Sequence, residues 1–550
     1  MPPLPRVPRI PLPQPGAVAL LLLALVLAWP VLVLLASWWP AADSAGQAQQ
    51  ILAEMARTVL PAYAATSLAL CIGVALGVTA VGLCSAVLVT VFDFPLRRTL
   101  QWALLLPLAM PAYVVAYAYT DFLQYSGPLQ TSLRNLLSLH GRVLPEVRSL
   151  GGAVWVFTFT LYPYVYLLAR TALSERAPQL LEAARLLGAP LSARLRRVAL
   201  PLARPAVVAG VALALMETLA DYGVVSYFGI QTFTAGIYKA WLAMDNRIAA
   251  AQLATLLLAW VVLLMSLQAH AQRRLRFTNS KGTSGRGTEA QPVRLVGVKA
   301  ALAIALCAIP VFVGFVLPVV FMLGPLVQQE LVLPWQAFTA WALNSLRLAT
   351  ITAALAVVLA WLLASSLRQR PGLVTRLAVQ TAGLGYAVPG AVIVVGLLLP
   401  LGWLQQVLPH WGIAAWMTTT VLGLLWAYQV RFCAVALQTL QSGYARIPAS
   451  VDDSARMLGV SGFALLTRVH VPLLKRSVAA ASLLVFVDVM KELPATLVLR
   501  PFDSDTLAVM VYQLARDERL GEAALPALTL VLVGLLPVLL LSRTLGDRDK

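Results

Sequence analysis

Long apolar runs separated by short polar stretches follow one another along the whole chain. A run of about 20 apolar residues is long enough to cross a lipid bilayer as a helix. Six such runs lie approximately at 17–37, 63–91, 99–120, 152–173, 206–228 and 250–268. Six more lie approximately at 299–323, 343–365, 376–400, 413–437, 477–499 and 524–542. The pattern predicts an all-α polytopic membrane protein with about 12 transmembrane helices.

The second set of runs repeats the first. Placing Gly188 on Gly459 gives an offset of 271 residues, at which Pro201 meets Pro472. Earlier in each half the offset is 278, where TSLAL at 66–70 matches NSLRL at 344–348. Because six is an even number, both halves enter the membrane from the same side. We therefore expect two parallel six-helix repeats, related by an axis along the membrane normal, with a path between them.

The repeat divides the chain into five parts. A cytosolic N-terminal tail at 1–16 precedes a first lobe at 17–271, in which a long polar loop occupies 174–205. A basic, Ser/Gly/Thr-rich cytosolic linker at 272–298 suits a flexible tether. The second lobe at 299–543 has its own long polar loop at 438–476, and a short cytosolic tail at 544–550 ends the chain.

Composition agrees with a membrane protein. Hydrophobic residues make up 60% of the chain and charged residues 12%, and the mean hydropathy is +0.81. The net charge of +18 is spread over alternate short loops, as the positive-inside rule requires, so it does not indicate a nucleic-acid partner. This distribution places both termini and both long polar loops in the cytoplasm. The first apolar run exceeds a signal-peptide core and is interpreted as an uncleaved helix.

The two long polar loops carry similar phrases, EAARLLG at 182–188 and DSARMLG at 453–459. The residues before Gly188 favour an α-helix. Glycine can adopt positive φ, so Gly188 is able to end that helix. Leu191, Leu195 and Val198 then form the apolar face of a second short helix, and Pro201 is expected to stop it. A pair of short helices joined by a turn could dock into a groove of a soluble partner or lie on lipid headgroups. Its occurrence once in each half favours docking.

At these residues the chain resembles a known family. EAARLLGAPLSARLRRVALP looks like the coupling motif of ABC importer permeases, with Val198 in place of Ile, and DSARMLGVSGFALLTRVHVP keeps its spacing. Asp453, Ser454 and Val471 depart from the motif in the second copy. The resemblance implies that a set of residues in both loops couples the chain to ATPases: Glu182, Ala183, Ala184, Gly188, Leu191, Leu195, Val198, Pro201, Asp453, Ser454, Ala455, Gly459, Leu466, Val469 and Pro472.

Two longer stretches, 216–241 and 491–528, resemble the fused permeases of ferric-iron ABC importers. That family implies an inner-membrane, multi-pass permease that works with two cytosolic ABC ATPase subunits and an extracytoplasmic ferric-iron-binding protein. The chain has no G-x-x-x-x-G-K-[ST] phosphate loop, so we expect no enzymatic activity in it and no cofactor bound by it, with ATP used by the partner subunits. Sister importers for thiamine, sulfate, molybdate or polyamines share the coupling phrase and are the nearest alternatives.

Four carboxylates fall inside apolar runs at matching positions. Glu217 and Asp221 are spaced i, i+4 on the fifth run, and Asp488 and Glu492 repeat that spacing on the eleventh. An acid in the bilayer costs about 2.5–3.5 kcal/mol on insertion scales, so these side chains should face protein or water. We expect them to line the translocation path and attract a hard cation such as Fe(III). Hydrogen bonding to neighbouring helices, with Lys491 or Ser226 as partners, is the structural alternative.

The remaining candidates carry less chemistry. Tyr113, Tyr117 and Tyr119 near Pro111 suggest rings at an outer membrane interface more than iron ligands. The four cysteines and four histidines are scattered without ligand spacing, so no metal site is expected. An ion-driven secondary transporter, with the intramembrane acids as proton sites, is a less favoured class. A membrane enzyme is the least favoured, because no nucleophile–base pair is recognisable.

Overall fold

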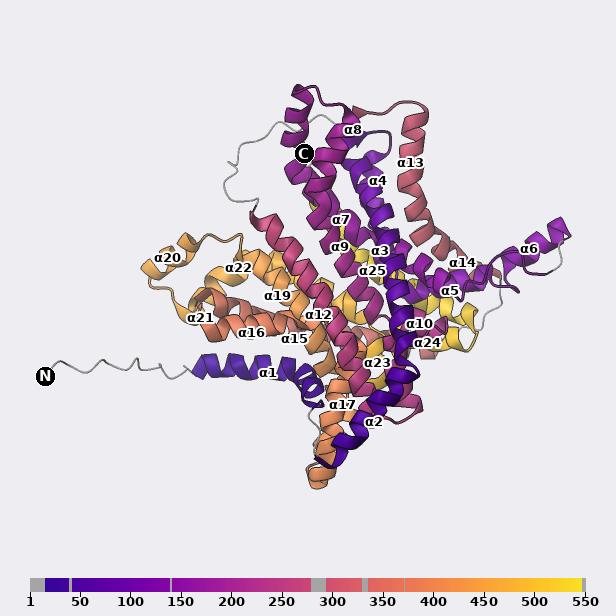
Figure 1. Cartoon of the computed structure of the whole chain (residues 1–550). Helices are drawn as coiled ribbons and strands as arrows, with labels where there is room; N and C mark the ends of the chain where they lie inside the picture. Colours follow the sequence, from indigo (N-terminus) through magenta and orange to yellow (C-terminus); the bar gives the residue numbers. More distant parts are fainter. Residues whose placement is uncertain are drawn as a thin grey trace.

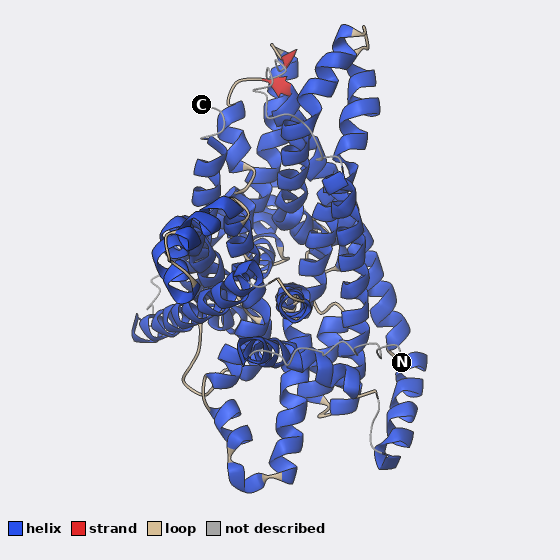
Figure 2. Ribbon diagram, turned by 90° about the vertical axis from the view of Figure 1, so that its left-hand side faces the viewer, coloured by secondary structure: helices blue, strands red, loops and turns tan. Residues whose placement is uncertain are grey.

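A computed structural model describes residues 15–38, 42–138, 141–277, 293–328, 335–369 and 371–546. Helices make up nearly all of it, as Figure 2 shows. Two short strands, β1 (Phe92–Asp93) and β2 (Val293–Arg294), pair in parallel at one end of the molecule. The predicted all-α fold is confirmed. Most of the expected N-terminal tail, the middle of the linker at 278–292 and the last four residues lie outside the described residues.

The first half contains the helices numbered up to α12 in Figure 1. Their bounds are α1 Pro15–Ala36, α2 Ala42–Arg57, α3 Leu60–Val91, α4 Arg97–Ala103, η1 Leu106–Ala109, α5 Ala112–Leu123, α6 Pro128–Leu137, α7 Leu150–Leu186, α8 Leu191–Arg194, η2 Leu195–Ala199, α9 Leu200–Ala220, α10 Gly223–Tyr227, α11 Phe233–Tyr238, η3 Lys239–Ala243 and α12 Arg247–Phe277.

The second half follows the same order of long and short helices. Its bounds are α13 Val298–Val311, η4 Phe312–Val316, α14 Leu317–Gln328, α15 Trp335–Gln369, α16 Leu373–Gly383, η5 Gly385–Ala387, α17 Gly390–Val407, η6 Pro409–Trp411, α18 Ile413–Thr419, α19 Leu422–Tyr444, α20 Ala449–Met457, α21 Gly462–Leu465, η7 Leu466–His470, α22 Val471–Met490, α23 Pro494–Leu499, α24 Leu507–Arg516 and α25 Leu520–Gly546.

The membrane-spanning helices agree in kind with the expectation of about 12 and differ in detail. Among the described residues, nine helices are long and apolar enough to cross a bilayer, and the number rises to eleven if each of two bent pairs is one span. The bent pairs fall on the runs expected at 99–120 and 413–437. The run expected at 477–499 is divided between α22, which ends at Met490, and α23; α22 also carries Lys475, Arg476 and Asp488, and it is not among the nine.

The run expected at 99–120 is not one straight helix. It breaks at Pro111, where the helices on either side meet at 90°. The residue before a proline is pushed out of the helical region of backbone space, and Met110 is indeed extended, with φ −90° and ψ 121°. Val388 before Pro389 is extended in the same way, with φ −77° and ψ 120°. The repeat therefore extends to the breaks in its helices.

Each half is built around one central helix. In the first half α7 packs between α3 and α9, and in the second half α19 packs between α15 and α22. Tyr162 and Tyr166 on α7 and Tyr428 on α19 are among the largest fully buried side chains. Close approach of α9 to α7 requires Gly210, because a Cβ there would meet the backbone of Val165.

The first helix of each half packs on the other half. Helix α1 lies mainly against α16 and α17, α13 lies against α3 and α4, and α14 lies against α5 of the first half and α25 of its own half. In Figure 1, α1 accordingly lies with the helices of the second half, and α13 with those of the first. Each half therefore contributes its first helix to the packing of the other half.

The two helix bundles diverge from a common end. In Figure 1, α7 and α9 run toward the top of the view, whereas α19 and α22 run toward the left. Figure 2, turned by 90°, shows some helices end-on while others run vertically, which agrees with this arrangement. The turns after α7 and after α20 consequently lie far apart, while α10, α23 and α24 lie near one another. We call the region where the halves converge the apex.

Candidate functional site

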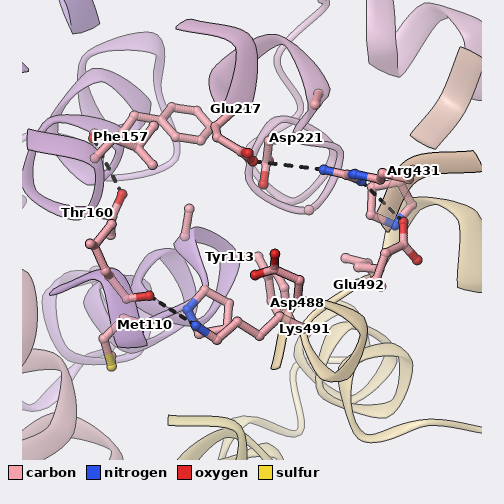
Figure 3. Close-up of a pocket in the computed structure, with 18 of the residues that line it drawn as sticks. Met110, Tyr113, Phe157, Thr160, Glu217, Asp221, Arg431, Asp488, Lys491 and Glu492 are labelled. Atoms are coloured by element: carbon pink, nitrogen blue, oxygen red, sulfur yellow. Dashed lines mark hydrogen bonds and ion pairs between the residues drawn. The ribbon is translucent and has the colours of Figure 1, made fainter. Parts of the chain in front are cut away.

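A cavity of about 180 Å³ opens between the two halves, and all four intramembrane carboxylates line it. Glu217 and Asp221 reach it from the end of α9 in the first half, and Asp488 and Glu492 from the end of α22 in the second. Figure 3 shows these side chains pointing into a shared space, together with Arg431 and Lys491. The structure thus brings together the four acids that the repeat pairs in sequence.

Glu217 is bound from the second half. The Tyr386 hydroxyl donates a hydrogen bond to Glu217 Oε1 at 2.8 Å. Arg431 Nη2 lies 3.9 Å from Glu217 Oε2, and Arg431 Nη1 lies 3.5 Å from Glu492 Oε1 (Figure 3). Arg431, on α19, therefore lies between carboxylates of the two halves.

Asp221 and Glu492 have a second role in local structure. Helix α9 ends at Ala220, and Asp221 Oδ1 accepts the Val224 N–H at the start of α10 at 2.8 Å. Glu492 follows α22 and accepts the N–H groups of Ala495 and Thr496 at 2.9 and 3.0 Å. Each acid thus caps the short helix that follows it. The expectation that Asp221 continues the fifth helix is wrong, because the chain turns there to begin α10.

Asp488 is placed differently from its neighbours. It makes no hydrogen bond or ion pair within the part of the chain that the structure describes, although the cations Lys491 and Arg431 line the same cavity. Lys491 Nζ donates to the Leu108 carbonyl in the first half at 3.0 Å. Asp488 is thus the carboxylate of the four with the fewest protein partners.

Sequence reasoning missed Arg431 and Tyr386 in this site. The signal for Arg431 was present, since an arginine inside an apolar run normally faces a bundle interior and pairs with an acid. Tyr113, Tyr117 and Tyr119 were misinterpreted as interface rings: each is only 4% exposed. Tyr113 lines the cavity, and the hydroxyls of Tyr113 and Tyr117 have no hydrogen-bond partner among the described residues.

The two polar loops fold alike around their glycines. Gly188 has φ +77° and Gly459 has φ +79°, as their role at helix ends predicted. In each loop the glycine N–H bonds the carbonyl three residues back and the next N–H bonds the carbonyl five residues back: Gly188 to Arg185, Ala189 to Ala184, Gly459 to Arg456 and Val460 to Ala455. Each loop therefore ends its helix with a Schellman motif.

The expected stop at Pro201 is wrong. Residues 191–220 form one continuous helix, in which the π turn η2 at Leu195–Ala199 precedes the proline. The π turn η7 at Leu466–His470 precedes Pro472 at the matching place. Proline has no N–H to donate to the helix. In both loops the proline follows a π turn, where the backbone hydrogen bonds already change from the i−4 to the i−5 carbonyl.

The apolar face of the second short helix packs on the protein itself. Leu191, Leu195 and Val198 are half-buried, as are Leu466 and Val469. The most exposed apolar residues of the two loops lie just before each glycine and were not singled out from sequence: Leu186, Leu187, Met457 and Leu458 are each at least 82% exposed. We call these two pairs the apolar tips.

The rest of the coupling set is distributed over the same turns. Glu182, Ala184 and Pro201 are half-buried and Ala455 is buried, whereas Ala183, Asp453, Ser454 and Pro472 are exposed. The described residues include no group of three or more His, Cys, Asp or Glu side chains that could hold a metal ion. The cavity carboxylates thus surround a space without forming a compact ligand set.

The chain is similar in sequence to known transport proteins. Residues 78–277 match the family described as binding-protein-dependent transport system inner membrane component. The chain is 25% identical to the Fe(3+)-transport system permease protein FbpB 2 of Haemophilus influenzae, over 86% of this chain and 87% of the relative. It is 23% identical to the probable ABC transporter permease protein y4fN of Sinorhizobium fredii, over 86% and 85%. The sulfate transport system permease protein CysT of Salmonella typhimurium is 28% identical over 34% of this chain and 67% of the relative.

Proposed function

Since the chain carries an inner-membrane component domain of binding-protein-dependent transport, we propose that it is the permease subunit of an ATP-driven importer of ferric iron. In this proposal the cavity between the halves is the substrate path, and the exposed turns at Gly188 and Gly459 dock two cytosolic ATPase subunits. An extracytoplasmic iron-binding protein delivers the cargo at the apex. Both termini lie in the cytoplasm, as the distribution of basic residues favours.

The observation that carries the substrate assignment is the charge of the cavity. Four carboxylates face two cations there, so the ionised cavity is net negative. Carboxylate and phenol oxygens are hard donors, suited to a hard cation. Relatives whose names indicate sulfate or molybdenum transport match the chain over 34% and 23% of its length, whereas the ferric-iron relative matches over 86%. The charge of the cavity favours a cation, and a relative named for ferric iron has the two-half length of this chain.

The docking assignment rests on the matched turns. Two exposed apolar tips on rigid Schellman turns, one in each half, present the same shape and chemistry twice. Apolar residues next to an i, i+3 ion pair, Glu182 with Arg185 and Asp453 with Arg456, suit insertion into a groove with a polar rim. A pair of identical ATPase subunits would offer two such grooves.

The direct test is ATP hydrolysis by the purified complex. We expect the chain, purified with its co-assembling subunits, to hydrolyse ATP several-fold faster when an iron-loaded extracytoplasmic binding protein is added. The same binding protein without iron is the control and should stimulate less. Uptake that survives loss of ATP but collapses with the proton gradient would instead support a secondary transporter.

A further inference from the structure

Arg431 lies where the two halves meet and has one carboxylate partner in each. Its two terminal nitrogens lie 3.9 Å from Glu217 in the first half and 3.5 Å from Glu492 in the second. The arginine side chain is 12% exposed, and its Nε has no hydrogen-bond partner among the described residues. Arg431 is therefore held mainly by opposite charges.

Further polar contacts cross the same boundary. Tyr386 of the second half donates to Glu217 of the first at 2.8 Å, and Lys491 donates to the Leu108 carbonyl at 3.0 Å. The Ser226 and Tyr512 hydroxyls lie 2.9 Å apart, and the Tyr238 hydroxyl donates to the Pro494 carbonyl at 2.6 Å. Each of these contacts is a single hydrogen bond or ion pair, so the cavity faces can part locally while the exchanged helices keep the halves packed together.

We propose that Arg431 is the positioning residue that closes the path between the two halves. It acts as a built-in counter-cation for Glu217 and Glu492, and it holds the halves together when no cargo is present. This inference rests on the proposed function only in treating the cavity as the substrate path. When the halves separate, Glu217 loses both Arg431 and Tyr386, and its carboxylate becomes available to an arriving cation.

The electrostatics explain why a cation is needed at this place. Without Arg431, Glu217 and Glu492 would face each other across the boundary with no intervening charge, and like charges in a weakly solvated site repel. With Arg431 present, one of these two negative charges is offset, so an ambient cation gains less by entering. The resident arginine thus excludes small ions and keeps the path available for cargo that arrives with the binding protein.

An arginine at this position occurs in the second half only. At the repeat offset of 271 residues, the first-half position that matches Arg431 is Thr160. Thr160 is buried, and its hydroxyl donates to the Val156 carbonyl within its own helix. The closing cation is therefore a departure from the repeat, as expected for a residue that bridges the two halves.

The test is passive ion leak in the absence of ATP, iron and binding protein. The full chain with its co-purifying subunits is reconstituted into liposomes that hold a dye quenched by Mn²⁺, and Mn²⁺ influx is timed. We expect Arg431→Gln to raise the influx rate about tenfold, because removing one partner of a buried charge pair leaves the others uncompensated. Arg431→Lys, which keeps the charge, should leak clearly less than Arg431→Gln.

Two further variants separate closure by charge from simple packing. Arg500→Gln is the matched control, since it breaks an ion pair with Asp505 inside the second half, and it should remain as tight as the unaltered chain. The double variant Glu217→Gln/Arg431→Gln should leak less than Arg431→Gln alone, because it also removes the repelling charge. If Arg431→Gln does not fold, Tyr386→Phe should still raise the leak about threefold.

Two results would overturn the proposal: an Arg431→Gln variant as tight as the Arg500→Gln control, or a double variant that leaks at least as fast as Arg431→Gln. Neither readout uses iron or ATP. A different transported substrate would thus leave the leak result unchanged, and the two proposals fail separately.

Discussion

The four carboxylates of the cavity are of two kinds, which differ in their local hydrogen bonds. Asp221 and Glu492 accept backbone N–H groups of the helices that follow them, so part of their charge is used in local structure. Glu217 and Asp488 lie one helical turn earlier and are free of that capping role. The sequence predicted the four positions but not this division, because the division depends on where α9 and α22 end.

A second group of polar residues distinguishes the two docking turns. Asp452 on α20 accepts from Arg368 Nε at 2.8 Å, and its other oxygen lies 3.0 Å from His470 Nε2. Arg368 also donates to the carbonyls of Tyr444, Ile447 and Pro448. The matching first-half residues, Leu181 and Ala199, cannot form such a network. The turn at Gly459 is therefore tied to α15 by charge, and the turn at Gly188 is not tied in this way.

We predict that Asp452→Asn loosens the second turn selectively. Removing one partner of a largely buried ion pair costs about 3–5 kcal/mol, which should appear as faster amide hydrogen exchange at 449–470 than at 182–199. Asp453→Asn, whose side chain is exposed, is the matched control and should change exchange little. Equal exchange in the two variants would contradict a structural role for Asp452.

The same network predicts a pH response. Burial opposes ionisation of Asp452, but the hydrogen bonds and charges of Arg368 and His470 prevail and hold its pKa below the ordinary value of 3.8. A lowered pKa in the folded state stabilises the fold above the unfolded pKa, and this contribution is lost as the pH falls through the folded pKa. Asp452 stays ionised from pH 5 to 8, a range roughly a unit or more above 3.8. Titration of Asp452 should therefore cause no change in the protection of 449–470 within that range. Protection from exchange, corrected for the intrinsic pH dependence of amide exchange, should then fall under strongly acidic conditions. A step near neutral pH that Asp452→Asn removes would contradict this assignment.

At the scale of elements, the turns are the parts most fully predicted. Glycine at the end of a helix-forming stretch predicted positive φ, and both loops have it. The course of the following segment was not predictable from Pro201, because the π turn that admits the proline into a continuous helix has no strong sequence signature. For the same reason the partial burial of Leu191 and Leu195 could not be predicted from the sequence.

We predict that Gly188→Val and Gly459→Val each uncouple ATP hydrolysis from transport. A β-branched residue at φ near +77° costs about 1–2 kcal/mol or more, so the turn rearranges and the adjacent apolar tip moves. Transport per ATP hydrolysed should fall several-fold in the reconstituted complex. Gly372→Val is the control, because Gly372 has φ −103° and open space around it. Wild-type coupling in both glycine variants would contradict docking through these turns.

At the scale of the whole molecule, the repeat predicted the two halves but not how they are joined. The exchange of α1 and α13 between halves places the first helix of each against the other, a packing that local apolar patterns do not encode. Arg431 illustrates the same limit, since its partners lie 214 residues before it and 61 after it in the chain, from position 217 to 431 and from 431 to 492. Divergence of the bundles from the apex is likewise a property of the assembled halves (Figure 1).

The cavity at that convergence is the central claim, and iron uptake into proteoliposomes tests it most directly. The complete importer is reconstituted with ATP and an iron-loaded binding protein, and radioactive iron, sulfate and molybdate are followed in parallel. We predict ATP-dependent accumulation of iron alone, and at least a tenfold loss in the double variant Glu217→Gln/Asp488→Asn, about 1.4 kcal/mol in free-energy terms. Undiminished iron uptake by that variant, or accumulation of sulfate or molybdate in place of iron, would contradict the account.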